Sequence, residues 1–203
     1  MMNRLVRPLA FGCALAALLT LTGCASGGIV PGTNRRILQN MAREYYDIAQ
    51  AYADLKKYDK ALEFYTLAAR NREFRKTSEY QIARMNAMSS KWEAAEKSYR
   101  TLLKEDPKST DIAASLAYVL AQGGKLDEAE ELYRTLTRDN PYNETLMGNY
   151  IRVLVAAQKT AEAQAELARF TELFPTSTVL TALTTLAAPS PPAADATEAP
   201  ATE

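Results

Sequence analysis

The residue types that most often carry catalysis or bind metal ions are scarce in this chain. The sequence has 203 residues and no His, so it lacks both the commonest general base and the commonest metal ligand. Its two Cys residues, Cys13 and Cys24, are too few for a zinc site with the usual four ligands. Acidic pairs such as Asp127-Glu128 are typical of a solvated helix face. We therefore expect no enzyme activity, no metal ion and no cofactor.

Cys24 stands where the sequence predicts a specific chemical modification. Arg4 and Arg7 precede an uncharged apolar run from Pro8 to Leu21, which is the layout of an export signal. The run has 14 residues, fewer than the roughly 20 that span a bilayer as a helix, so we expect it to be cleaved. An ordinary thiol behind a conventional signal is the alternative reading of Cys24.

The segment Leu21-Thr22-Gly23-Cys24 resembles the lipobox of bacterial lipoproteins. The resemblance implies that residues 1–23 are removed as a signal peptide and that Cys24 is lipidated with acyl chains and becomes the new N-terminus. Neither Ala25 nor Ser26 is the Asp that signals retention at the inner membrane in many such proteins, so the resemblance favours an outer-membrane anchor facing the periplasm. Residues 24–33, which are rich in Gly and small residues, are then expected to form a flexible tether.

The charge balance limits the choice of partners. The chain has 24 Lys and Arg against 24 Asp and Glu, whereas a nucleic-acid partner requires clustered positive charge. Removal of Arg4 and Arg7 leaves 22 basic and 24 acidic residues, a net charge of minus 2. We therefore expect no nucleic acid, and an attachment to the membrane through lipid and not through charge.

The elements that would position a binding site repeat every 34 residues. Four copies follow without a gap, over residues 42–75, 76–109, 110–143 and 144–177. Position 20 of the copies is always Ala, position 24 is Tyr in three copies, and position 32 is Pro in the last three. Small residues at fixed points allow two helices to approach closely, and a Pro marks where a helix must stop. Large residues such as Tyr45, Ile48 and Tyr52 recur at helical spacing.

This pattern resembles the tetratricopeptide repeat, a helix-turn-helix unit of 34 residues. The resemblance covers residues 42–177 and implies an all-α, right-handed superhelical solenoid of four repeats within a domain spanning residues 34–188. The repeat family has Pro near position 32, where the first copy has Glu73, so the second helix of that copy is expected to run longer.

The end of the stack is expected to carry a cap. Residues 178–188 can form a short helix with Leu180, Leu183 and Leu186 inward and with threonines outward. Residues 189–203, with four Pro and several acidic residues, cannot bury enough apolar surface to offset ordering entropy, so we expect a disordered tail.

In the resembling family the first helices line a concave groove, and the matching positions define the candidate site. We expect the protein-binding groove to include the following residues: Arg43, Tyr46, Gln50, Tyr80, Arg84, Tyr118, Gln122 and Arg152. Tyr and Arg are enriched in binding hot spots. The family's clamp for a C-terminal carboxylate is absent, because Gln81 and Asp111 stand at two of the positions where it has basic or amide residues.

Together these features predict a membrane-anchored adaptor or scaffold with protein partners in the cell envelope. The partner would offer an extended or helical segment, and the resemblance suggests assembly of a pilus or a secretion system as the setting. The alternative is an accessory small-ligand-binding lipoprotein of a transport system. An enclosed apolar cavity would favour the alternative, and an open groove would favour the adaptor.

Overall fold

The computed structural model describes residues 33–188, and all regular structure in that range is helical. The chain forms two compact units, residues 1–40 and residues 41–203. The described part of the first unit is the start of α1, and the remaining description concerns the second unit. The predicted export signal, the lipobox at Cys24, the tether up to residue 32 and the tail from residue 189 lie outside the described residues.

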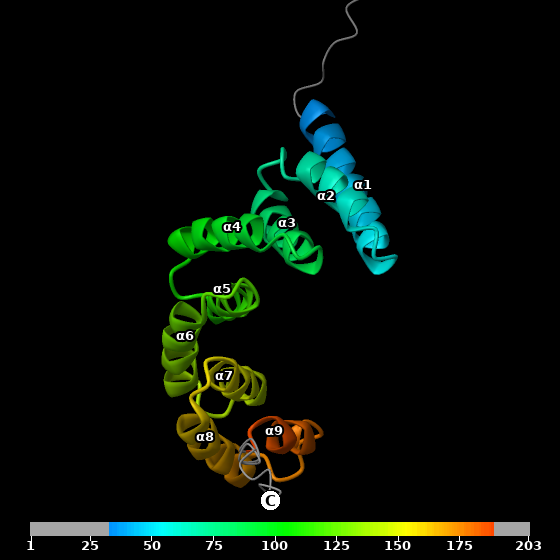
Figure 1. Ribbon diagram of the computed structural model, residues 1–203. Helices are drawn as coiled ribbons and strands as arrows, with labels where there is room; N and C mark the ends of the chain where they lie inside the picture. Colours follow the sequence, from blue (N-terminus) through cyan, green and yellow to red (C-terminus); the bar gives the residue numbers. More distant parts are fainter. Residues whose placement is uncertain (1–32, 189–203) are drawn as a thin grey trace, which may run out of the picture. The chain divides into compact units, whose positions relative to one another are not determined.

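Helices α1 to α8 alternate as the first and second helices of the four copies, and α9 follows the last copy. Their bounds are α1 Thr33–Asp54, α2 Tyr58–Ala68, α3 Arg75–Met88, α4 Trp92–Glu105, α5 Thr110–Gln122, α6 Leu126–Asp139, α7 Glu144–Ala156, α8 Thr160–Leu173 and α9 Leu180–Leu186. From α2 to α8 each helix packs against the next one in sequence. Within the second unit, α3, α5 and α7 lie along one side of the stack and α4, α6 and α8 along the other (Figure 1). The predicted all-helical solenoid is confirmed.

The repeated small residues lie where the helices approach each other. At position 20, Ala61, Ala95, Ala129 and Ala163 are all fully buried. At position 8, Ala49, Ala83, Ala117 and Ile151 are also fully buried. The tyrosines of position 24, Tyr65, Tyr99 and Tyr133, retain at most 3% of their accessible surface. A close approach of two helices leaves no room for more atoms at such positions, so the sequence periodicity correctly identified the core.

The turn between the two helices of a copy has the same backbone geometry in all four copies. Position 15 has a positive φ at Lys56 (56°), Ser90 (57°), Gly124 (82°) and Gln158 (60°). The following residue is Lys in every copy, and its N–H donates to the carbonyl five residues earlier, as in a Schellman motif. Only Gly124 adopts this left-handed conformation without a steric cost, so the turn of the third copy is the least strained.

Side-chain caps and prolines set the ends of the inner helices. The Ser109 Oγ accepts a hydrogen bond from the Ile112 N–H (3.3 Å) before α5, and the Asn143 Oδ1 accepts one from the Leu146 N–H (3.1 Å) before α7. Such caps satisfy backbone donors that the first turn of a helix leaves unpaired. Pro107 follows the end of α4 at Glu105 by two residues, and the same spacing recurs after α6 and α8.

The expectation of a longer second helix in the first copy is wrong. Helix α2 ends at Ala68, which is position 27, whereas α4, α6 and α8 end at position 30. The Asn71 side chain accepts a hydrogen bond from the Glu73 N–H (2.9 Å), which forms a local turn in competition with the helix. Without a Pro at Glu73, helix α3 then begins one position earlier than α5 and α7 do.

The short helix α9 packs against α7 and α8 at the end of the stack. Leu183 is fully buried, and its Cδ1 lies 3.6 Å from the place that a Cβ at Gly148 would occupy. Thr181, Thr184 and Thr185 are exposed, as expected for the outer side of a cap. Leu180 is half-buried, but Leu186 is 42% exposed, so its predicted inward position is wrong. Leu186 is the last residue of α9, where no further helix turn covers it.

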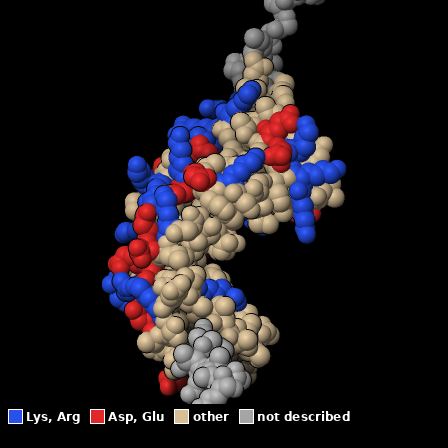
Figure 2. Space-filling view, in the orientation of Figure 1, with Lys and Arg blue, Asp and Glu red and all other residues tan. Residues whose placement is uncertain are grey.

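Ion pairs link consecutive second helices. The Lys125 ammonium contacts the Glu96 carboxylate at 2.9 Å, and the Lys159 ammonium contacts the Glu130 carboxylate at 2.8 Å, one copy further on. The hydrogen bond from Lys125 is the largest factor that holds the pKa of Glu96 below its usual value. In Figure 2 the acidic and basic side chains intermingle along the side occupied by α4, α6 and α8. This side therefore carries mixed charge and joins the copies electrostatically.

Candidate functional site

The first helices α3, α5 and α7 present a row of polar and aromatic side chains on one side of the stack. On α3, Tyr80, Arg84 and Met88 are spaced by four residues, and on α5, Tyr118 and Gln122 share the same spacing. Residues four apart lie on one helix face, so these side chains point in a common direction. The hollowed surface between α3 and α7 in Figure 2 is largely free of acidic side chains.

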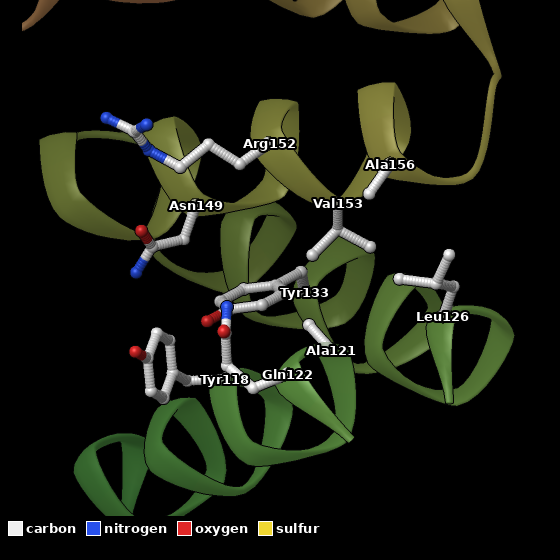
Figure 3. A pocket seen from close by; sticks show the side chains of 9 residues that line it. All are labelled: Tyr118, Ala121, Gln122, Leu126, Tyr133, Asn149, Arg152, Val153 and Ala156. Carbon is white, nitrogen blue, oxygen red and sulfur yellow. The ribbon is translucent and has the colours of Figure 1, made fainter. Parts of the chain in front are cut away.

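The first hollow on this side lies between α5, α6 and α7 (Figure 3). Its volume is about 100 Å³, and its lining residues are Tyr118, Ala121, Gln122, Leu126, Tyr133, Asn149, Arg152, Val153 and Ala156. The ring of Tyr133 forms the floor, with Tyr118, Gln122 and Asn149 around its hydroxyl end. Burial raises the pKa of Tyr133, and hydrogen bonding with Asn149 offsets part of that rise. The floor therefore keeps a protonated hydroxyl and an amide facing the hollow.

The second hollow lies between α3, α4 and α5 and has a volume of about 280 Å³. Its lining residues are Tyr80, Arg84, Ala87, Met88, Tyr99, Ala114, Ser115, Tyr118, Val119 and Asn149. The Tyr80 hydroxyl lies 3.2 Å from the Ser115 Oγ, and the Tyr80 ring meets the Tyr99 ring edge-on at 5.8 Å. Because both hollows share Tyr118 and Asn149, they form one continuous surface, which we call the groove.

The depth of the groove follows from position 5 of the copies. That position is Tyr46 in the first copy, Tyr80 in the second, Ala114 in the third and Gly148 in the fourth. In the first two copies the ring packs edge-on against the tyrosine of position 24, at 5.2 Å and 5.8 Å. The small Ala114 leaves the space beside Tyr80 unfilled, so a hollow opens there, whereas Leu183 of α9 covers Gly148.

The side chains that line the groove give it a positive potential. Arg84 and Arg152 are the lining residues that carry charge at neutral pH, and no carboxylate lines either hollow. Both arginines are exposed, so they can reach toward a ligand without leaving a buried position. The amides of Gln122 and Asn149 supply donors and acceptors for a polypeptide backbone. The groove is therefore suited to a segment that combines apolar or aromatic side chains with acidic ones.

Five of the eight sequence-predicted groove residues come together in this surface. Tyr80, Arg84, Tyr118, Gln122 and Arg152 all line the two hollows. Three residues of α1 do not: Arg43 and Gln50 are exposed on α1, and Tyr46 packs against Tyr65 and Phe74 at ring distances of 5.2 Å and 5.9 Å. Tyr46 is half-buried by these contacts, so its ring already serves the core of the first copy.

Tyr99, Tyr133 and Ser115 line the groove but were not among the residues predicted for it. Their positions predict packing, and burial of Tyr99 does raise its pKa to about 12. The hydroxyl groups of the two tyrosines could have indicated a position at the groove, because a buried phenol requires a hydrogen-bond partner or an opening to solvent. Tyr at position 24 therefore indicates a floor with polar atoms, which a purely apolar residue would not provide.

A third hollow, of about 540 Å³, lies on the other side of the stack between α4, α5 and α6. Four leucines form its apolar lining: Leu103, Leu116, Leu120 and Leu132. Arg100, Asp127, Glu128 and Glu131 also line it, and Arg100 is bound to Glu128 at 2.5 Å. The neighbouring junctions of the stack each have two polar residues at the positions of these four leucines. They are Asn86 and Ser98 between the first and second copies, and Thr137 and Glu166 between the third and fourth. The second-to-third junction is therefore the most apolar of the three on this side.

The described residues 33–188 contain neither the ligand cluster of a metal site nor a membrane-spanning helix. No group of three or more His, Cys, Asp or Glu in this range could hold a metal ion. No helix in the same range is long and apolar enough to cross a membrane.

Models of the tetratricopeptide repeat match residues 42–73, 89–144 and 124–186 of the chain. A protein described as an uncharacterized lipoprotein from Treponema pallidum (strain Nichols) is 33% identical over 76 residues. That match covers 37% of this chain and 39% of the relative, so the similarity spans less than half of either protein.

Solved structures show the same fold at low sequence identity. A tetratricopeptide repeat protein from Parabacteroides merdae ATCC 43184 has a TM-score of 0.63 at 16% identity, covering 73% of this chain and 59% of that one. MamA from Desulfovibrio magneticus RS-1 has a TM-score of 0.62 at 15% identity, covering 71% and 84% of the two chains. YrrB, described as having an unusual peptide-binding site, has a TM-score of 0.56 at 17% identity, covering 74% and 77%.

Proposed function

Because the chain belongs to the tetratricopeptide repeat family, we propose that it is a non-catalytic adaptor that holds a segment of a partner protein in the groove. The observation that carries the proposal is the continuous lining of the groove by tyrosines, amides and two arginines from three successive first helices. Such surfaces suit an extended or helical polypeptide, because side chains supply contact area and amides bind the backbone. YrrB, which shares the fold, is described as having an unusual peptide-binding site.

The proposal includes attachment to a membrane through Cys24. The lipobox-like segment that ends at Cys24 supports it, as does the similarity to a lipoprotein over 76 residues. Two or three acyl chains on one residue hold a protein to a bilayer far more firmly than a single chain does. In this proposal the anchor lies in the outer membrane, the solenoid faces the periplasm, and the partner belongs to an envelope machine such as a pilus or secretion system.

The groove supports the adaptor better than the small-ligand alternative. The two hollows of the groove measure about 100 Å³ and about 280 Å³, and neither is an enclosed cavity. A small-molecule site usually encloses most of its ligand. The larger hollow beside Tyr80 adjoins the smaller one through Tyr118 and Asn149, so the two together form an elongated surface. An elongated surface of this kind matches a chain segment better than a compact metabolite.

Replacing Tyr80 and Arg84 together by Ala tests the groove. We expect partner affinity to fall by on the order of 2 kcal/mol, about thirtyfold, because truncating hot-spot side chains removes contact area and leaves partner groups unpaired. The measurement is photo-crosslinking in cells from a benzoylphenylalanine at Tyr118, followed by identification of the captured protein and titration of its purified form.

The matched control replaces Tyr142 and Arg138 together by Ala, since both are exposed and lie outside the groove. Circular dichroism verifies that both double variants keep their helical content. Equal affinity for the wild type, the groove variant and the control would rule out binding through the groove.

Replacing Cys24 by Ser tests the anchor. We expect the variant to lose its acyl chains and to move from the membrane fraction to the soluble fraction, because the acyl chains on Cys24 are the proposed attachment to the bilayer. Metabolic labelling with a fatty acid and fractionation of the cells measure this change. Cys13→Ser is the control and should stay labelled, and an unlabelled wild-type protein would contradict lipidation.

A further inference from the structure

The hollow on the side of α4 and α6 has an apolar floor and two apolar walls. Leu116 and Leu120 lie one turn apart on α5 and form the buried floor, whereas Leu103 of α4 and Leu132 of α6 are half-buried on the walls. Helices α4 and α6 both pack on α5 but have no extensive contact with each other, so a space of about 540 Å³ is left between them (Figure 1). We call this space the leucine hollow.

Stacking of the copies does not by itself explain the four leucines. The neighbouring junctions also pack closely, although each has two polar residues at the positions of these leucines. Asn86 stands at the position of Leu120, and Thr137 stands at the position of Leu103. An apolar hollow that is open to solvent, and that the packing of the repeats does not require, is typical of an interaction site.

The α6 wall of the leucine hollow carries three carboxylates, from Asp127, Glu128 and Glu131. The equivalent residues of the second and fourth copies include one carboxylate each, Glu93 and Glu162. Asp127 and Glu128 lie in the first turn of α6, where a carboxylate also stabilises the helix, but Glu131 lies beyond that turn. The most apolar of the three junctions is therefore also the one with the most acidic wall.

The single basic residue of the lining is already neutralised by carboxylates. The Arg100 guanidinium contacts Glu96 at 2.9 Å and Glu128 at 2.5 Å. Glu131 shares an arginine of its own helix with a second carboxylate, and Asp127 makes no ion pair within the described residues. One basic residue against three acidic ones gives the lining a net charge of minus 2. This potential favours a ligand that carries positive charge.

The polar atoms of the lining favour a helical ligand over an extended one. An extended segment requires hydrogen-bond partners for its backbone N–H and C=O groups, whereas a helix satisfies most of its own. The groove offers the amides of Gln122 and Asn149 for this purpose, but no amide side chain lines the leucine hollow. Thr135 is the one uncharged polar residue among its lining residues.

We propose that the leucine hollow is a second docking site, which binds an amphipathic helix of a partner protein with leucine-like residues on one face and Lys or Arg beside them. The apolar residues, at positions i, i+3, i+4 and i+7 of that helix, pack on the four leucines. The basic residues meet Asp127 and Glu131 on the α6 wall. The negative lining disfavours a bilayer with acidic lipids. This inference is independent of the groove, which contains two arginines and lies on the other side of the stack.

Model peptides test the chemistry of the ligand. The probe is a fluorescent helix of about 18 residues, long enough to be helical in water, with Leu at the four stripe positions of each repeat and Lys and Ala elsewhere. The control peptide has Glu in place of every Lys. We expect the full chain to bind the Lys peptide about tenfold more tightly than the Glu peptide, as measured by fluorescence anisotropy. Equal affinity for the two peptides would overturn the proposal.

A pair of Lys substitutions tests where the peptide binds. Leu132→Lys places a cation in the leucine hollow and should weaken binding of the Lys peptide about tenfold. Ser98→Lys introduces the same charge at the equivalent position of the second copy and should change the affinity by less than about twofold. Circular dichroism verifies that both variants keep their helical content. Equal affinities of the two variants would place the peptide elsewhere and overturn the proposal.

A second pair of variants avoids the half-buried Leu132. Replacing Asp127 by Asn together with Glu131 by Gln removes two exposed carboxylates of the wall and should weaken binding of the Lys peptide about fivefold. The control, Glu93→Gln with Asp106→Asn, removes two exposed carboxylates that do not line the hollow. It should leave the affinity almost unchanged. A control that weakens binding as much as the wall variant would show nonspecific attraction and overturn the proposal.

Photo-crosslinking identifies the occupant. Benzoylphenylalanine at Thr135 should capture the Lys peptide, whereas benzoylphenylalanine at Tyr118 in the groove should not. In cells, the segment captured from position 135 should be a stretch of another protein with leucine-like and basic residues at helical spacing. Capture of the peptide from position 118 alone would overturn the proposal. Capture of a second copy of this chain, of lipid or of an acidic segment from position 135, or of no protein at all, would also overturn it.

Discussion

Replacing Tyr133 by Ala is expected to lower the free energy of unfolding by about 3 to 5 kcal/mol, the usual range for deleting a buried aromatic ring. Tyr133 is 1% exposed and belongs to the large core cluster that joins the second, third and fourth copies. Its ring fills the space between α5, α6 and α7, so its removal would leave a cavity among these helices. Chemical denaturation followed by circular dichroism measures the change.

The control for Tyr133→Ala is the same substitution at Tyr142, which is 79% exposed. That variant should differ from the wild type by no more than about 0.5 kcal/mol, because surface substitutions away from packed contacts have small effects. If the two variants unfolded at the same denaturant concentration, the tyrosines of position 24 would not be core residues, and the assignment of the groove floor would fail with them.

Replacing Ala95 by Leu is expected to destabilise the chain by about 1 to 3 kcal/mol, the typical cost of overpacking. Ala95 is fully buried on α4, where it faces the close contact between the helices of the second copy. The adjacent Ala94 is exposed on the same helix, so Ala94→Leu provides a control with the same side-chain change and the same helix propensity. The measurement is the midpoint of chemical denaturation of the Ala95→Leu and Ala94→Leu variants. A lower midpoint for Ala94→Leu than for Ala95→Leu would contradict the repeat register.

Much of the fold could be predicted because the period fixes which residues are equivalent. The alanines of positions 8 and 20 and the prolines of position 32 are short-range signals, and they placed the helix contacts and the helix ends correctly. The end of α2 was missed because the side-chain turn at Asn71 competes with the helix, and position 73 alone gave no sign of it. Similarly, Lys56, Ser90 and Gln158 adopt a left-handed turn geometry that their residue types do not indicate, whereas a glycine stands at the equivalent position 124.

The groove could be predicted in part, because face assignments follow from helical spacing. The predicted residues from α3, α5 and α7 lie together along one surface, because helical spacing sets which of them share a face. Tyr46 lies outside that surface, because its ring packs on Tyr65 and Phe74, a long-range contact that spacing within α1 does not reveal. The third hollow was missed for the same reason: Leu103 and Leu132 lie on different helices, and only their packing on α5 brings them to one place.

The packing of each helix against its sequence neighbours determines how quickly the chain can find its fold. The helix pairs with extensive contacts in the described range are no more than two helices apart in sequence, as α7 and α9 are. Forming such contacts closes only short loops, so little chain entropy is lost before each contact is gained. Helical proteins with contacts this local fold in about microseconds to milliseconds. A chain of this kind can fold one repeat after another as the repeats emerge from a narrow channel, before its C-terminal residues have emerged.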